Sequence, residues 1–344
     1  MVADFVGLTV DLGAVARNWL AMAARAPGAR AGAVVKADAY GLGAAQVVPA
    51  LYAAGARDFF VAITPEGHAI RPLLTADARI FVMEGPRPGD DLSGLIPVIN
   101  GPEQWFRHCA THPGAPFAVQ IDTGMSRLGL TAGDWTALRA EMLAAGPQLI
   151  MSHLYCADAP DHPANTRQLE IFRSLTDGCD VPLSLAATGG ILLGSDYHFD
   201  LVRPGVGLYG GQPFAEAEAA VHLTIPVIQT REVEAGVEVG YGAAFTAPHR
   251  MRIATLGAGY ADGLPRSLGG RLQLWAGDRM VPAVGRISMD AITADVSGLA
   301  DVPPMLTVIG PQQGVDQLAA QAGTIGYEML TGLGHRYARR YLPG

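Results

Sequence analysis

The sequence predicts an α/β fold: a (β/α)8 TIM barrel over residues 1–222, followed by a mostly-β C-terminal domain over residues 223–344. In the first part, short apolar runs alternate with longer amphipathic segments, which is the pattern of β/α units. After residue 223, β-rich segments separated by turns replace the helical periodicity. The chain has 344 residues, 49% of them hydrophobic, which is enough for two cores. We expect the first residues, to about residue 10, to pack with the C-terminal domain.

Eight strands are expected in the barrel, each a short apolar run, at residues 31–36, 59–63, 79–83, 96–99, 116–121, 148–152, 182–186 and 199–203. Among the helices between them, residues 44–54 and 164–176 each place their apolar side chains on one face. Catalytic groups of such barrels collect at the carboxyl ends of the strands, so the residues that follow each strand form the candidate site.

The C-terminal domain is expected to contain strands at residues 223–233, 251–257, 271–275, 279–287, 291–296 and 305–309. Between two of them, Gly277-Asp278 is typical of a two-residue hairpin turn. The sequence shows no internal repeat and no long linker, so we expect the two domains to be packed rather than tethered.

Composition excludes several classes of function. The net charge of −8, with no basic cluster to offset it, argues against a nucleic-acid partner or an anionic membrane surface. The three cysteines, Cys109, Cys156 and Cys179, form no C-x-x-C pair and leave an odd thiol, which favours a cytoplasmic protein. The start of the chain lacks a basic signal-peptide region, and every apolar run is shorter than the roughly 18 residues of a membrane span.

The most informative segment runs from Ala33 to Gly43, in which an apolar β-type run ends in Lys36. A lysine at the end of a buried strand is desolvated, which lowers its pKa and frees the amine to form a Schiff base with an aldehyde. Tyr40 and the following glycines add a hydroxyl and close backbone approach, as a phosphate requires. From this segment alone, a strand-end lysine that extends to solvent is an equal alternative.

Two further candidates follow the fifth and sixth strands. Arg127 lies on the glycine-flanked loop 122–129, where its guanidinium could bind a carboxylate in a forked arrangement. His153 follows the sixth strand and places an imidazole at the same mouth. On the residues alone, a solvated loop arginine and a structural histidine are the more common outcomes for these two positions.

The eighth strand leads into a predicted phosphate site. Arg203 is followed by a turn at Gly205 and Val206 that exposes successive backbone N–H groups and leads into a helix. Phosphate sites commonly lie in this part of a barrel. Thr188, on a glycine-flanked loop after the seventh strand, could add a hydroxyl.

In this order and spacing, six stretches resemble the alanine racemase family, and the resemblance covers essentially the whole chain. They are residues 33–43, 122–129, 202–210 (VRPGVGLYG), 239–245 (VGYGAAF), 259–263 (GYADG) and 284–290 (VGRISMD). The family consists of pyridoxal-phosphate enzymes built from an eight-stranded α/β barrel and a β domain. The resemblance implies an isomerase that interconverts L-alanine and D-alanine for cell-wall metabolism, with pyridoxal 5'-phosphate as cofactor, no metal, and a homodimer with shared active sites.

The resemblance also implies two catalytic groups on opposite faces of the substrate. Lys36 matches the lysine that carries the cofactor and acts as base towards the D-enantiomer. Tyr241 matches the acid/base for the L-enantiomer, which the family supplies from the partner subunit. Inversion at Cα requires such a pair, because one group removes the proton and the other returns it. The substrate-binding residues implied by the resemblance are Arg127, Met289 and Tyr260.

The remaining implied roles concern the cofactor. The phosphate would be held by Tyr40, Thr188, Gly205 and Val206, and His153 would pack on the pyridine ring. Arg203 matches the partner of the pyridine nitrogen. Since arginine keeps its proton, it would leave the ring a weaker electron sink than a carboxylate would, which suits racemisation.

Several positions differ from the commonest family pattern. Gln120 stands where many members carry a carbamylated lysine that orients the substrate-binding arginine. A carbamate cannot form on glutamine, although its amide could hydrogen-bond in the same place. Ala187 and Asp38 replace frequent asparagines, Leu42 replaces a frequent histidine, and His335 falls near a position that bears a phosphate-binding tyrosine in some members. These differences concern cofactor affinity and substrate preference.

Two other functions remain open. One is a related enzyme of this barrel type, either a racemase of broader specificity or a basic-amino-acid decarboxylase, although such decarboxylases pair the pyridine nitrogen with a carboxylate. The other is a pyridoxal-phosphate-binding carrier without catalysis. Such carriers resemble only the first 220 or so residues, so the segment that contains Tyr241 argues against this alternative.

Overall fold

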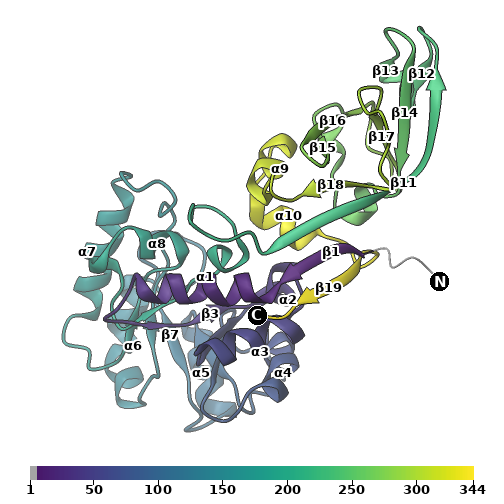
Figure 1. The fold of residues 1–344 in the computed structure, drawn as a ribbon. Coiled ribbons are helices and arrows are strands. Elements are labelled where there is room, and N and C mark those ends of the chain that lie inside the picture. The colour runs from purple at the N-terminus through teal and green to yellow at the C-terminus, as the bar shows by residue number, and fades with distance from the viewer. Residues whose placement is uncertain (1–5) are drawn as a thin grey trace. The chain divides into compact units, whose positions relative to one another are not determined.

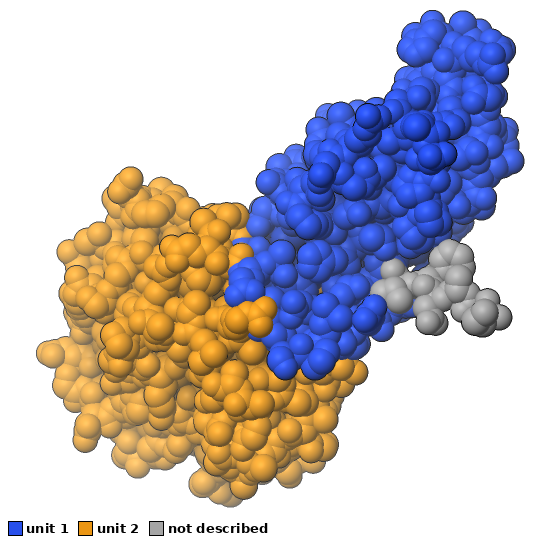
Figure 2. Space-filling view, in the orientation of Figure 1, with its two compact units in different colours: residues 1–14, 209–211, 218–344 blue, residues 15–208, 212–217 orange. Residues whose placement is uncertain are grey.

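The structure is a computed structural model that describes residues 6–344. It divides into two compact units (Figure 2). One, here called the barrel unit, comprises residues 15–208 and 212–217. The other, the β unit, takes in the described residues before Val15, residues 209–211 and residues 218–344. Each unit is described by itself below.

The barrel unit is built on parallel strands. Seven of them form one sheet in chain order: β3 (Ala33–Val34), β4 (Asp58–Val61), β5 (Arg79–Val82), β6 (Ile96–Ile99), β7 (Ala118–Gln120), β8 (Ile150–Met151) and β9 (Leu183–Ser184). The last strand, β10 (Leu201–Val202), pairs with β2 (Arg30–Ala31), which runs directly into β3. On its other side, Arg203 N–H donates to the Ala186 carbonyl at 2.8 Å. The eight predicted strands are confirmed, and together they close the barrel.

Gly32 separates β2 from β3 within a single strand path. A Cβ at this position would lie 2.8 Å from the Phe60 ring and 3.0 Å from the Asp58 carbonyl oxygen. The neighbouring strand therefore approaches so closely that only glycine fits. The strand path is hydrogen-bonded on both sides: Gly32 N–H donates to Val202 O and Val34 N–H to Pro204 O, whereas Val35 N–H donates to Phe60 O.

Helices lie around the outside of the strands (Figure 1). They are α1 (Leu12–Ala24), α3 (Ala44–Ala54), α4 (Thr64–Ile70), α5 (Pro102–Thr111), α6 (Ala132–Ala144), α7 (Ala164–Thr176) and α8 (Thr188–Leu192). The helices predicted at 44–54 and 164–176 are confirmed. The expectation of eight complete β/α units is wrong at one connection, because residues 83–95, between β5 and β6, contain no helix. Two prolines and two glycines between residues 85 and 89 explain this, since neither residue type sustains a helix.

The β unit contains a sheet in the order β14-β17-β16-β15-β18-β11-β1-β19, and β14 also pairs with β11. The strands are β1 (Val6–Asp11), β11 (Val221–Val233), β14 (Met251–Leu256), β15 (Gln273–Ala276), β16 (Arg279–Val284), β17 (Ile292–Asp295), β18 (Met305–Ile309) and β19 (Ala338–Leu342). All six strands predicted here are confirmed, and Gly277-Asp278 does connect a hairpin, in which Ala276 pairs with Arg279.

Strand β1 and several elements without a predicted range also belong to the β unit. Strand β1 pairs antiparallel with β11 and parallel with β19. A small hairpin joins β12 (Glu238–Val239) to β13 (Phe245–Thr246), and two helices, α9 (Val315–Ala322) and α10 (Gly326–Gly332), precede β19. Across the described residues, no helix has both the length and the apolar character needed to cross a membrane.

Candidate active site

Lys36 lies just beyond its strand, at the start of an unusual turn. Strand β3 ends at Val34, and Lys36 begins the segment α2 (Lys36–Gly41). The next four residues, from Ala37 to Tyr40, all have positive φ values, between 52° and 57°. A left-handed backbone costs roughly 1–2 kcal/mol at each non-glycine residue. Surrounding contacts must therefore hold this turn in place.

Two carboxylates supply such contacts at the two ends of the turn. The Glu66 carboxylate accepts the Ala37 N–H at 2.8 Å and the Ala62 N–H at 2.8 Å. The Asp38 carboxylate accepts the Ala44 N–H at 2.7 Å, at the first residue of α3. Asp38, one of the departures from the family pattern, thus links the turn to the following helix. Sequence reasoning missed Glu66; its place in the first turn of a helix that follows a strand was the available signal.

The surroundings of Lys36 favour the free amine. Burial is the main cause that lowers the pKa of Lys36, and the nearby Arg127 guanidinium lowers it further. The carboxylates of Glu66 and Glu84 act in the opposite direction, but the net change is downward. Among the 24 lysine and arginine residues of the chain, Lys36 is the only lysine. Any chemistry of an ε-amine in this protein must therefore take place here.

The predicted phosphate residues come together beside this turn. Thr188, the first residue of α8, accepts the N–H groups of Gly205 and Gly207 on its hydroxyl oxygen, at 3.0 and 3.4 Å. The Tyr40 hydroxyl lies against Gly205, where a Cβ would be 2.5 Å from its oxygen. Val206 begins η3 (Val206–Tyr209), the turn that follows. Two hydroxyls and several backbone N–H groups thus converge on one small region, which is what a bound phosphate needs.

Arg203 is buried without a carboxylate partner. Its guanidinium donates to the Ser152 carbonyl at 2.6 Å and to the Ser184 hydroxyl, and the side chain is only 2% exposed. No ion pair involves Arg203 within residues 6–344. Burial lowers the pKa of Arg203 to about 9, so the group still carries its charge at neutral pH. The barrel therefore contains an uncompensated positive charge that favours an anionic or electron-rich ligand.

His153 is a neutral imidazole in this site. Burial, followed by the charges of Arg203, Arg127 and Lys36, lowers its pKa from 6.5 to about 3. Its backbone is held by Gln168, a residue that sequence reasoning missed. The Gln168 amide nitrogen donates to the His153 carbonyl at 2.9 Å and to the Thr123 hydroxyl at 3.0 Å. Gln168 itself is fully buried on α7.

This depressed pKa predicts an acid-sensitive stability. Between pH 6.5 and about 3, His153 would be protonated in the unfolded chain but neutral in the folded one. The unfolded state then binds more protons, so the free energy of unfolding falls as the pH falls through this window, by at most about 1.4 kcal/mol per pH unit. Urea unfolding of cofactor-free protein at several pH values should show a flatter dependence for His153→Gln. The same change at the exposed His249 should leave the slope unchanged, and equal slopes for all three proteins would contradict the prediction.

The Arg127 loop is shaped by hydrogen bonds to its backbone. The Asp122 carboxylate accepts the N–H groups of residues 124, 125 and 126, and the Gln120 amide nitrogen donates to the Leu128 carbonyl at 3.1 Å. Arg127 itself is exposed. In the described part of the chain, no hydrogen bond joins Gln120 to the Arg127 guanidinium. Gln120 therefore holds the loop that carries Arg127 rather than the guanidinium.

Two other departures from the family pattern have a structural explanation. Leu42 is fully buried directly after the left-handed turn, so it contributes to the core. Ala187 forms an isolated parallel bridge with Arg203, which involves only its backbone. Neither position requires a polar side chain for the contacts seen here.

The candidate residues of the β unit are exposed. Tyr241, the first residue of η4 (Tyr241–Ala243), is 73% exposed, and Met289 and Tyr260 are 53% and 41% exposed. The backbone brings the last two together, because Tyr260 N–H donates to Ser288 O and Ala261 N–H donates to Met289 O. His335 is also exposed. Three large side chains of the predicted site thus remain available for contact.

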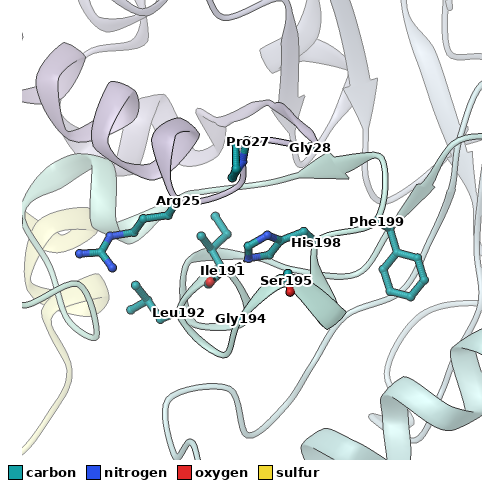
Figure 3. A pocket seen from close by; sticks show the side chains of 9 residues that line it. All are labelled: Arg25, Pro27, Gly28, Ile191, Leu192, Gly194, Ser195, His198 and Phe199. Carbon is teal, nitrogen blue, oxygen red and sulfur yellow. Dashed lines mark hydrogen bonds between the residues drawn. The ribbon is translucent and has the colours of Figure 1, made fainter.

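A cavity of about 370 Å³ lies elsewhere in the barrel unit (Figure 3). Its lining includes Pro27 and Gly28, which precede β2, and Ser195 and His198, which precede β10. It therefore opens near the amino ends of these strands, whereas Lys36, Thr188 and Gly205 follow the carboxyl ends. None of the predicted site residues lines it.

Comparison with known proteins matches both units. The family described as alanine racemase, N-terminal domain, matches residues 10–213, and the family described as alanine racemase, C-terminal domain, matches residues 220–341. An alanine racemase of Cereibacter sphaeroides (strain ATCC 17025) is 56% identical over 339 residues and covers 97% of each chain. One of Dinoroseobacter shibae is 54% identical over 343 residues, with 98% of each chain covered.

Solved structures agree with these matches. The alanine racemase from Bartonella henselae with covalently bound pyridoxal phosphate has a TM-score of 0.93 and 35% identity, covering 97% of this chain and 99% of its own. The biosynthetic alanine racemase from Pseudomonas aeruginosa has a TM-score of 0.90 and 36% identity, covering 98% of this chain and 99% of its own. The similarity thus extends through the barrel unit and the β unit, and the chain belongs to the alanine racemase family of isomerases.

Proposed function

We propose that this protein interconverts L-alanine and D-alanine with pyridoxal 5'-phosphate as its cofactor, in the cytoplasm, for cell-wall metabolism. The single observation that supports this most strongly is the arrangement at the barrel mouth. There, the chain's only lysine lies beside a cluster of phosphate-binding groups and a buried arginine, which pairs with no carboxylate among residues 6–344. The free thiols of Cys109, Cys156 and Cys179 support a reducing compartment.

The residues present fit this cofactor. Tyr40, Thr188 and the N–H groups of Gly205 and Val206 would hold the phosphate, and Lys36 would carry the covalent link. When bound, pyridoxal phosphate supplies an electron-withdrawing ring that acidifies the α-proton of an attached amino acid. The glycine at position 205 supports the fit, because a larger residue there would collide with the Tyr40 hydroxyl.

Arg203 and His153 would define the surroundings of the ring. The Arg203 guanidinium can donate a hydrogen bond to a ring nitrogen, but it keeps its own proton, so that nitrogen stays uncharged. His153, which is neutral, can pack on the ring without adding charge. Both residues thus limit how strongly the site withdraws electrons, which favours return of the proton to Cα over competing reactions.

Proton transfer would involve two residues on opposite faces of the substrate. Lys36, with its lowered pKa, would remove or return the proton on the D-face. Tyr241 of the partner subunit would do the same on the L-face, and the 73% exposure of this tyrosine within its own chain supports such a role. Arg127 would bind the substrate carboxylate, and Met289 and Tyr260 would line the substrate site. The functional unit is therefore a homodimer with shared active sites.

Circular dichroism of the purified protein with each of several amino acids tests this function. L-Alanine should lose its signal until both enantiomers are equal, because the reaction interconverts mirror images. L-Serine, L-lysine and L-arginine, run in parallel, distinguish an alanine racemase from a racemase of broader specificity. A stable L-alanine signal with the cofactor-loaded protein would exclude the proposed reaction and favour a carrier without catalysis.

A further inference from the structure

We propose that Glu66 is the positioning residue for Lys36. Its carboxylate links the backbone directly after Lys36 to the end of strand β4 and so holds the lysine at the barrel mouth. This inference rests on the proposed function, in which Lys36 carries the cofactor.

The geometry connects two separate segments through one side chain. Glu66 lies in the first turn of α4. One carboxylate oxygen accepts the Ala37 N–H at 2.8 Å, and the other accepts the Ala62 N–H at 2.8 Å. Ala37 follows Lys36 directly, and Ala62 follows the last residue of β4. Hydrogen bonds to an ionised carboxylate are about twice as strong as those between neutral groups.

The backbone after Lys36 needs such a restraint. Positive φ values begin at Ala37 and continue through Tyr40. Alanine has no side-chain group that could stabilise a left-handed conformation locally, as asparagine or aspartate can. The Ala37 N–H therefore marks the point where the chain leaves the strand and enters the strained turn. Glu66 holds that point, while Asp38 restrains the other end through Ala44.

An ordinary helix-capping role does not account for both contacts. The bond from Ala62 N–H to Glu66 stays local to the start of α4, as in many helix N-termini. The bond from Ala37 N–H instead joins residues 29 positions apart and ends beside Lys36. A residue that only capped α4 would have no need of this second contact.

A second carboxylate provides a matched control. The charged groups that act on Lys36 are Arg127 from the loop after β7, Glu66 from α4 and Glu84 from the segment after β5. Both carboxylates favour the charged ammonium, but only Glu66 bonds to the turn, because the side chain of Glu84 pairs with Arg87. Glu84→Gln therefore removes a comparable charge and leaves the backbone of the turn alone.

The test compares Glu66→Gln, Glu66→Asp and Glu84→Gln with the wild-type protein. Cofactor-free protein is first labelled with an amine reagent over a range of pH. Because Lys36 is the only lysine, peptide mapping separates its label from that of the terminal amine. Deuterium uptake of the peptide covering residues 33–44 then measures how well the backbone amides of the turn are protected from exchange. Finally, pyridoxal phosphate is added, and the rate of its covalent attachment is followed by borohydride trapping.

Both Glu66 variants should expose the turn to exchange and slow cofactor attachment by about tenfold or more, the effect of losing one charge-assisted hydrogen bond. Glutamine places an NH2 group opposite a backbone donor, and aspartate is too short to bridge both amides. Glu84→Gln should shift only the pH dependence of labelling. If Glu66→Asp behaves as wild type while Glu66→Gln matches Glu84→Gln, Glu66 acts by charge alone and the proposal is wrong.

Two outcomes keep this inference separable from the proposed function. If wild-type protein fails to attach the cofactor, the proposed function fails, while exchange and labelling of cofactor-free protein still decide the role of Glu66. If thermal unfolding shows that a Glu66 variant does not fold, deuterium exchange of the backbone amides in the wild-type protein tests the role of Glu66 instead. Rapid exchange of the Ala37 and Ala62 amides there would overturn the proposal.

Discussion

Replacing Lys36 with alanine is expected to leave a protein that neither binds pyridoxal phosphate covalently nor racemises alanine. The substitution removes the only ε-amine of the chain, so both the link to the cofactor and the base on the D-face are lost. We expect the racemisation rate to fall by about 10⁴-fold or more, the upper end for loss of a general base. Borohydride reduction followed by mass spectrometry should find the cofactor on the Lys36 peptide of the wild-type protein and on no peptide of the variant.

A relocated lysine provides the control for this experiment. Arg173 is half exposed on α7, where it pairs with Asp196. The double variant Lys36→Ala/Arg173→Lys again has one ε-amine, but outside the barrel mouth. This double variant should take up no cofactor label and remain inactive, because the amine at residue 173 is neither buried nor close to the phosphate-binding groups. Equal labelling at residue 173 would show that any accessible amine is sufficient and would remove the argument for a specific site.

Mixing two inactive variants is expected to restore activity. If each active site takes Lys36 from one subunit and Tyr241 from the other, then Lys36→Ala and Tyr241→Phe each lack one group in every site. After subunit exchange, half of the dimers are mixed, and half of their sites are intact. Activity should therefore approach about one quarter of the wild-type value, for random pairing in a two-fold dimer. Racemisation after mixing, followed by circular dichroism, measures the recovery.

Isotope exchange provides an independent check on the same two residues. In deuterated solvent, Tyr241→Phe should still exchange the Cα proton of D-alanine, because Lys36 remains, but it should lose the exchange of L-alanine. No recovery on mixing, despite demonstrated subunit exchange, would mean that the two groups act within one chain. Exchange of both enantiomers by Tyr241→Phe would mean that another residue serves the L-face.

The regular elements were predictable because their signals are local. The apolar runs locate all eight barrel strands, and the one-sided apolar pattern locates α3 and α7. The left-handed turn after Lys36 was not predictable, since Ala37 and Ala39 have no preference for positive φ. The carboxylates of Glu66 and Asp38 accept backbone N–H groups at its two ends, and the bond to Glu66 spans 29 residues of sequence.

In the candidate site, too, some residues were predictable from local sequence and others were not. Lys36, Arg203 and the glycines after β10 could be proposed because they follow barrel strands, where such groups collect. Gln168 could not, because a glutamine within an amphipathic helix is usually exposed, whereas this one is fully buried and binds the backbone near His153. The hydrogen bond between Gln120 and Leu128 likewise follows from the shape of the loop and not from its composition.

The pairing of β1 affects the order in which the chain acquires its structure during synthesis. All strands of the barrel unit lie between Arg30 and Val202, so that unit has its complete set of strands once this segment has left the ribosome. Strand β1 is made first, yet its partners are β11, which starts at Val221, and β19, which ends at Leu342. The nascent chain must therefore carry β1 without a partner until β11 has been made, and with one unpaired edge until translation is almost complete. During that interval β1 is a strand to which chaperones or neighbouring nascent chains can bind.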